Sequence, residues 1–213
     1  MRFINRNKEK IFCIGFNKTG TTTIEKALKD FGYTMGNQNK GEMLIFDWYK
    51  RDFKKIIKLS KTADAFQDIP FSLPFSYAFL DNHFKNAKFI LTERDTPEQW
   101  YNSITKFHAG LWGDNNVPPT KEQLKIAKYR YEGYAYDSFK LLYKTDDIDL
   151  YNKEELIKAY NSHIYSVKEY FRGRQEKLLC INVSKKTDYK NLCKFLNKEQ
   201  LRETFPWENK TPK

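Results

Sequence analysis

The sequence Lys10-Ile-Phe-Cys-Ile-Gly-Phe-Asn-Lys-Thr-Gly-Thr-Thr-Thr-Ile24, continued by Glu25-Lys-Ala-Leu28, decides the fold. Residues 11–14 form a short apolar run, which predicts a buried β-strand. Residues 15–20 form a loop with a glycine at each end, and from residue 21 the apolar residues recur with helical spacing. Such a strand, loop and helix start binds phosphate, because backbone N–H groups and the positive end of the helix dipole converge on one anion.

The loop departs from the phosphate loop of ordinary ATPases and GTPases at one position. That loop has the sequence G-x-x-x-x-G-K-[ST], and its lysine contacts the β- and γ-phosphates. Gly15 and Gly20 have the same spacing, but Thr21 stands where the lysine belongs. Lys18, two residues before the second glycine, is the only lysine in the loop. The sequence therefore disfavours an ordinary nucleoside triphosphatase.

The segment Asn17-Lys18-Thr19-Gly20-Thr21-Thr22 resembles the P-K-S-G-T-T loop of P-loop sulfotransferases. In that family the loop binds the 5′-phosphosulfate of 3′-phosphoadenosine-5′-phosphosulfate (PAPS). The resemblance implies PAPS as cofactor, PAP as product, and a Lys18 contact to the oxygen that bridges phosphate and sulfate. Another kind of phosphate loop, or a lysine that only faces solvent, is the alternative. The implied donor-binding residues of this loop are Asn17, Lys18, Thr19, Gly20, Thr21, Thr22 and Thr23.

A second segment, Lys88-Phe-Ile-Leu-Thr-Glu-Arg-Asp-Thr-Pro-Glu-Gln-Trp-Tyr-Asn-Ser103, resembles the other sulfotransferase signature. There, an arginine at a strand end and a serine on the next helix bind the 3′-phosphate of PAPS, which implies these roles for Arg94 and Ser103. A guanidinium fork suits a phosphate dianion. The two residues are nine positions apart here, against the usual eight, with Thr96 as the apparent insertion. The alternatives are a surface ion pair for the arginine and a helix serine without a function.

Asp68 is the first candidate for the catalytic base. It ends a predicted strand and precedes Ile69-Pro70, in the place where cytosolic sulfotransferases carry the histidine of a T-H-L-P segment. Burial would have to raise its pKa for it to take a proton from the acceptor, unless it only orients the acceptor. A turn-forming aspartate before a proline is the alternative. His108 is the second candidate base, although a helix-end histidine is more often a charge partner of the helix C-terminus.

The C-terminal segment Phe205-Pro-Trp-Glu-Asn-Lys210 resembles the F-P-x-x-N ending of one branch of the superfamily. The R-K-G element with which cytosolic sulfotransferases bind the 3′-phosphate is not found in the sequence, and Lys210 is its possible substitute. The residues between 108 and 150 match no known motif.

Composition predicts a globular chain of ordinary domain size. The 213 residues, 40% of them hydrophobic, suggest one sulfotransferase domain over residues 1–213. No apolar run approaches the roughly 18 residues of a membrane span, and the first ten residues lack the apolar core of a signal peptide. Three cysteines without metal-ligand spacing favour a reducing, cytoplasmic setting, and no metal is expected. The net charge of +11 comes from scattered lysines, which indicates a compositional bias or attraction for an anionic cofactor more than a nucleic-acid partner.

Apolar strands alternating with helices predict an α/β fold. We expect a three-layer, P-loop NTPase-like architecture with a mostly parallel sheet of four to five strands. Ligands of such sheets collect at the carboxyl ends of the strands, where Lys18, Asp68 and Arg94 each follow a strand. The predicted strands are residues 11–14, 62–67, 88–92 and 178–183, and helical periodicity covers residues 21–31, 41–60, 75–84, 97–108, 120–144, 153–171 and 188–196.

The resulting functional prediction is a PAPS-dependent sulfotransferase that passes a sulfuryl group to a hydroxyl or amine acceptor. A small-molecule kinase on the same scaffold and a catalytically silent PAP-binding module are the alternatives. We expect the acceptor pocket to be lined by residues from 33–48 and 107–140, but sugar, lipid, peptide and phenol acceptors all remain open.

Overall fold

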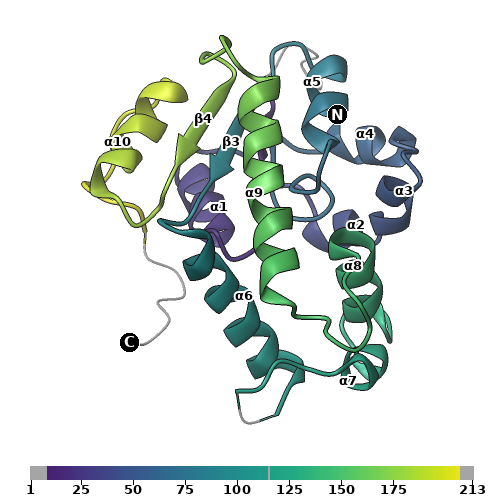
Figure 1. The fold of residues 1–213 in the computed structure, drawn as a ribbon. Helices are drawn as coiled ribbons and strands as arrows, with labels where there is room; N and C mark the ends of the chain where they lie inside the picture. Colours follow the sequence, from purple (N-terminus) through teal and green to yellow (C-terminus); the bar gives the residue numbers. More distant parts are fainter. Residues whose placement is uncertain (1–8, 115, 207–213) are drawn as a thin grey trace. The chain divides into compact units, whose positions relative to one another are not determined.

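The structure, a computed structural model, describes residues 9–114 and 116–206. The chain divides into two compact units, and Figure 1 shows its helices and strands coloured along the sequence. The first consists of Met1–Glu93 together with Val167–Lys213, and the second of Arg94–Ser166. The helix α9 (Lys153–Tyr170) begins in the second unit and ends in the first.

A parallel sheet forms the centre of the first unit. Its strands are β1 (Ile11–Cys13), β2 (Ala65–Phe66), β3 (Lys88–Thr92) and β4 (Leu178–Ile181), in the order β2-β1-β3-β4, and every pair is parallel. Helices flank this sheet, so the predicted three-layer α/β fold is confirmed. The predicted second strand was too long, because only two of its residues pair with β1.

The two faces of the sheet bury different side chains, because successive residues of a strand point to opposite faces. Ile11 and Cys13 belong to a buried cluster with α1 (Thr21–Asp30) and α10 (Lys186–Phe195). Phe12, between them, stacks instead on other rings, with centroid distances of 5.6–5.8 Å to Phe66, Phe71, Phe84 and Phe89. A sheet buried on both faces matches the continuous apolar strands of the sequence.

The strand order places residues 15–20, the predicted phosphate loop, at the topological switch point. From β1 the chain reaches β2 on one side of the sheet and β3 on the other. In open parallel sheets the crevice for ligands lies outside the carboxyl ends of the strands at such a reversal. The loop that follows β1 therefore has the position of a ligand-binding loop.

The predicted helical region 41–60 is divided into short helices. These are α2 (Gln38–Glu42), α3 (Ile45–Tyr49) and α4 (Lys54–Ser60), and α5 (Ser76–His83) follows β2. Arg51 interrupts the region with a φ of 60°, in the left-handed range that an α-helix cannot contain. The helical periodicity of residues 41–60 therefore predicted helical structure correctly but not the points where the helices end.

The second unit contains α6 (Pro97–Trp112), α7 (Lys121–Ile126) and α8 (Tyr134–Tyr143). The single helix predicted for residues 120–144 is wrong, because Gly133 adopts a left-handed conformation at φ 87° and starts α8 as a separate helix. The helix predicted over residues 97–108 is longer in the structure, since α6 continues to Trp112. In the part of the chain that the structure describes, no helix has the length and apolar character to cross a membrane.

Candidate active site

The phosphate loop is held between the ends of two other strands. A Cβ added to Gly15 would lie 2.1 Å from Thr92 Oγ1 at the end of β3. A Cβ added to Gly20 would lie 2.4 Å from Val183 Cγ2, just beyond β4, and the φ of Gly20 is 105°. Lys18 is also left-handed, with a φ of 70°. Both glycines are therefore needed for close packing, and Gly20 also for its backbone conformation.

Thr19 fastens this loop from inside. Its side chain is fully buried, and its hydroxyl donates to the Phe16 carbonyl oxygen and pairs with Thr92 Oγ1, both at 2.5 Å. These bonds use the hydroxyl within the protein. Thr19 therefore shapes the loop, and any contact that it makes to an anion comes from its backbone.

The helix α1 starts directly after the loop, with Gly20 as its N-cap. Its first turn consists of Thr21, Thr22, Thr23 and Ile24, so it carries no acidic residue to repel an anion. Thr22 is exposed, whereas Thr21 and Thr23 are buried. The N–H groups and dipole of this helix end favour an anion.

Asp68 lies beside the phosphate loop. It follows β2 in a left-handed conformation at φ 65° and is buried, with 8% of its surface exposed. Burial raises its pKa to about 7, and the charge of Glu42 acts in the same direction. The N–H of Ile69, the side chain of Asn17 and the charge of Lys18 oppose this shift. The structure thus brings Asp68, Asn17 and Lys18 together, and it gives Asp68 a pKa suited to exchanging a proton near neutral pH.

Arg94 and Ser103 lie in the second unit. The backbone N–H of Arg94 donates to Tyr160 Oη at 3.0 Å, and burial lowers the pKa of its guanidinium, against the effects of Tyr160 and Asp95. Ser103 lies on α6 and its Oγ donates to the Gln99 carbonyl oxygen at 2.8 Å, a common bond for a helix serine. Both residues keep their predicted places, after β3 and on the following helix.

The extra residue between them has a structural function. Thr96 is the N-cap of α6, where its hydroxyl accepts from the Gln99 N–H at 3.1 Å, and Pro97 occupies the first turn. A threonine cap followed by proline is a strong helix start. The longer spacing between Arg94 and Ser103 therefore includes the residue that starts their helix.

A family comparison agrees with this arrangement. The sequence-family model described as "Sulfotransferase domain" matches residues 10–213. The chain belongs to the sulfotransferase family. A search among curated proteins gave no match. Since the match covers nearly the whole sequence, this chain is a sulfotransferase and thus a transferase enzyme.

Around Asp68 the sulfotransferase contains a partly buried polar network that the sequence analysis missed. The Gln38 Nε2 donates to Glu42 Oε1 at 2.9 Å and to Asp68 Oδ2 at 3.3 Å. The Gln67 Nε2 donates to Gln38 Oε1 at 3.1 Å and to Glu25 Oε2 at 3.2 Å. Gln67 directly precedes Asp68, so the rule that placed Asp68 at a strand end could have found it. No sequence signal marks Glu42, whose burial depends on packing between distant segments.

The second candidate base, His108, lies in an aromatic cluster of the second unit. Its Nδ1 is 2.8 Å from Tyr151 Oη, and its ring contacts Trp112, Phe139 and Tyr151. These contacts give the histidine a packing role in the folded chain. Lys210, the predicted substitute for the R-K-G element, lies outside the described residues.

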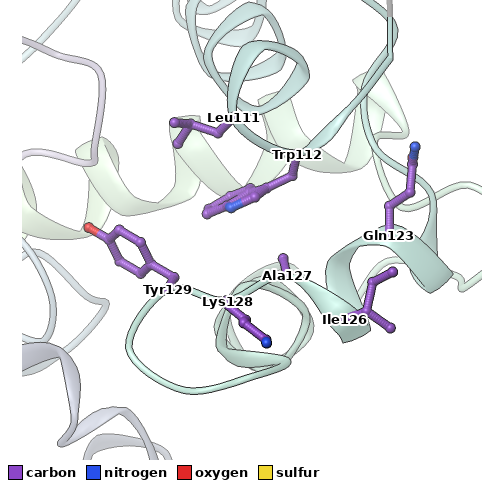
Figure 2. Close-up of a pocket in the computed structure, with 7 residues that line it drawn as sticks. All are labelled: Leu111, Trp112, Gln123, Ile126, Ala127, Lys128 and Tyr129. Carbon is purple, nitrogen blue, oxygen red and sulfur yellow. The ribbon is translucent and has the colours of Figure 1, made fainter.

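The second unit also contains an open pocket of about 460 Å³ (Figure 2). Figure 2 shows the Trp112 ring in the middle of the lining residues and the Tyr129 ring to one side of it. Their centroids are 6.0 Å apart, and the rings meet edge to face at an interplanar angle of 81°. These aromatic faces and the nearby Lys128 suit a flat or apolar group. The pocket falls within the range 107–140 in which acceptor contacts were expected. Its lining residues are Leu111, Trp112, Gln123, Ile126, Ala127, Lys128 and Tyr129.

Across residues 9–114 and 116–206, no cluster of three or more histidine, cysteine, aspartate or glutamate side chains could hold a metal ion. All three cysteines fall within these ranges, and Cys13, Cys180 and Cys193 are free thiols. Burial raises the pKa of the Cys13 thiol to about 12. This thiol is therefore protonated at neutral pH and a poor nucleophile.

Proposed function

We propose that this sulfotransferase uses PAPS as its donor and passes the sulfuryl group to a hydroxyl or amine acceptor, with PAP as the second product. The observation that carries the proposal is the group formed by Lys18, Asn17 and Asp68. A cationic loop and a carboxyl with a pKa of about 7 act on one another at the carboxyl end of the sheet. This combination provides charge stabilisation and proton transfer in one place.

The loop residues fit the anionic end of the donor. The start of α1 presents threonines, the fixed glycines hold the loop in place, and Lys18 supplies a positive charge. In this proposal Asn17, Thr19, Gly20 and residues 21–23 bind the 5′-phosphosulfate through backbone N–H groups and exposed hydroxyls. When bound, PAPS supplies an activated sulfuryl group whose transfer depends on positioning and electrostatic stabilisation.

Lys18 stabilises the negative charge that develops on the departing phosphate oxygen. Asp68 accepts the proton of the acceptor hydroxyl or amine, because its raised pKa makes it a stronger base than an ordinary aspartate. Lys18 and the helix end provide the positive charge here, so we propose transfer without a metal ion. Arg94 and Ser103 bind the 3′-phosphate in this scheme, which rests on the resemblance of their segment to the family signature, and Lys210 is a further candidate.

We propose further that the two compact units belong to one sulfotransferase domain, which the match over residues 10–213 supports. The free thiols at Cys13, Cys180 and Cys193 favour a reducing, cytoplasmic setting. We propose a small molecule, glycan or peptide as the acceptor and no nucleic-acid partner.

Thermal-shift titrations with PAP, ADP and ATP–Mg²⁺, run side by side, test the donor. A ligand that binds only the folded state raises the melting temperature. We expect PAP to stabilise the protein strongly and ADP weakly, since ADP lacks the 3′-phosphate. Equal stabilisation by ATP–Mg²⁺ would replace this proposal with the kinase alternative.

Asp68→Asn then tests catalysis separately from binding. We expect sulfuryl transfer to fall by roughly 10²–10⁴-fold, the usual contribution of a general base, while PAP binding persists. Full activity in this variant would remove Asp68 as the base and direct attention to His108. If the native chain binds PAP but transfers to no hydroxyl or amine acceptor in a broad panel, it is the silent PAP-binding module.

A further inference from the structure

Two buried carboxylates share one side-chain amide next to the phosphate loop. Glu42 has 3% of its surface exposed and Asp68 8%. The Gln38 amide nitrogen lies 2.9 Å from Glu42 Oε1 and 3.3 Å from Asp68 Oδ2. An amide nitrogen carries two hydrogens, so Gln38 can donate one to each carboxylate. This bridge links the proposed base to a second acid.

The orientation of the bridging amide is fixed by its other end. Gln38 Oε1 accepts from the Gln67 Nε2 at 3.1 Å, and the same nitrogen of Gln67 donates to Glu25 Oε2 at 3.2 Å. Turning the Gln38 amide over would bring its oxygen to the two carboxylates and its nitrogen to a donor. Each end of the Gln38 amide therefore has a single sensible assignment.

The helix α2 is built to hold this bridge against Asp68. Gln38 and Glu42 are four residues apart, so they lie on the same face of the helix. Asn37 caps the helix by accepting from the Lys40 N–H at 2.9 Å. A Cβ at Gly41 would lie 2.9 Å from the Ile69 carbonyl oxygen, so the glycine lets α2 pack directly on the backbone after Asp68.

Burying the charged Glu42 carboxylate costs folding free energy. A glutamine at residue 42 could accept the same hydrogen bond from Gln38 without a charge. A negative charge close to Asp68 makes ionisation of the Asp68 carboxyl unfavourable. An acid at residue 42 thus affects the chemistry of Asp68 in a way that a glutamine could not.

We propose that Glu42 is a positioning residue of the transfer reaction, which orients the Asp68 carboxylate through Gln38 and whose charge favours a proton on Asp68. The inference rests on the proposed function of Asp68 as the base. The charge of Glu42 is one of the two factors that raise the pKa of Asp68.

The other charged groups around Asp68 act differently. Lys18, on the phosphate loop, favours the ionised carboxylate and opposes Glu42. Glu25, on α1, reaches this network only through Gln67. Cys13, on β1, is a buried neutral thiol. Glu42 is therefore the group whose removal should lower the pKa of Asp68, and Glu25 provides a matched acid for comparison.

The test is an NMR titration of the side-chain carboxyl carbon of Asp68 in the full chain, labelled with ¹³C-aspartate. Asp68→Asn identifies the signal. We compare the native protein with Glu42→Gln, which keeps the shape and the bond to Gln38 but removes the charge, and with Glu25→Gln. We expect the midpoint to fall by about one pH unit or more in Glu42→Gln and to stay in place in Glu25→Gln. An unchanged midpoint in Glu42→Gln, or an equal fall in both variants, overturns the proposal.

Gln38→Leu is the second variant if Glu42→Gln does not fold. It removes the bridge while leaving both acids, so the Asp68 signal should change its chemical shift in the ionised state. An unchanged shift would refute the positioning part. The titration needs no donor or acceptor, so its outcome is independent of whether PAPS is the substrate.

With an active acceptor in hand, the rate profile gives the functional readout. Glu42→Gln should move the ascending limb of kcat/KM to lower pH and reduce kcat, and Glu42→Asp should restore part of both. If Glu42 had only a structural role, Glu42→Gln would lower the amount of folded enzyme without shifting the ascending limb of the kcat/KM profile. A moved NMR midpoint without any sulfuryl transfer by the native chain would refute the proposed function but leave the coupling of the two acids intact.

Discussion

Asp68→Asn tests the buried carboxyl through protein stability, without any substrate. Burial and the charge of Glu42 raise the pKa of Asp68 from 3.8 to about 7. Since one pH unit corresponds to about 1.4 kcal/mol, ionised Asp68 costs the folded state about 4 kcal/mol. A carboxyl with a raised pKa stabilises the fold fully below its unfolded pKa. That stabilisation is lost as the pH rises through the folded pKa, from about 4 to about 7.

The assay is urea unfolding of the native protein and of Asp68→Asn at pH 5 and at pH 8. Between these values the native protein should lose about 3 kcal/mol that the variant keeps, because the asparagine is neutral at both. Titration of other groups cancels in the comparison, so the difference reports the ionisation of Asp68. The exposed Asp52 provides the control, since Asp52→Asn should follow the native protein. Parallel stabilities of the native protein and Asp68→Asn at both pH values would refute the reasoning.

Three further substitutions test the donor site. Gly20→Ala should destabilise the fold by roughly 1–3 kcal/mol and weaken PAP binding, because residue 20 has a left-handed backbone and the new methyl would meet Val183. Gly32→Ala is the control, since residue 32 is also left-handed but has no neighbour within 4 Å. It should cost only about 1 kcal/mol and leave PAP binding unchanged in calorimetry. Lys18→Met should abolish most sulfuryl transfer in a radiolabel assay while the melting temperature without ligand changes little, and unaltered turnover would exclude Lys18 from catalysis. Arg94→Ala should weaken PAP more than ADP in thermal-shift titrations, and equal loss for both would show that it does not read the 3′-phosphate.

The sequence predicted well those parts of the molecule that short-range patterns determine. The strand, loop and helix of residues 11–30 follow from an apolar run, two glycines and helical spacing, and each appears in the structure. Asp68 was found because it ends a strand, and parallel strands expose their carboxyl ends at one edge. The helix start at residue 120 was predicted, and the structure has a capping box there between Thr120 and Gln123. The break at Gly133 was missed.

The polar network could not be predicted from the sequence. Glutamate is normally a surface residue, but Glu42 is buried. Its burial depends on the close approach of Gly41 to the Ile69 backbone. No pattern in the sequence links these two segments. Similarly, the helical periodicity of residues 41–60 gave no sign that the backbone of Arg51 would adopt a left-handed conformation. A candidate such as Asp68, which follows a strand, can be predicted from the sequence. Groups such as Glu42, which change the pKa of that candidate, are brought to it by tertiary packing.

The contacts that hold the predicted phosphate loop have a consequence for folding during synthesis on the ribosome. Residues 10–28 are synthesised early, but Thr92, the partner of Thr19, follows 73 positions later. Val183, against which Gly20 packs, follows Gly20 by 163 positions. A nascent chain that stops short of β4 therefore lacks one of the two contacts that hold this loop. The loop reaches its final packing only after Thr92 and Val183 have been synthesised and the sheet has formed.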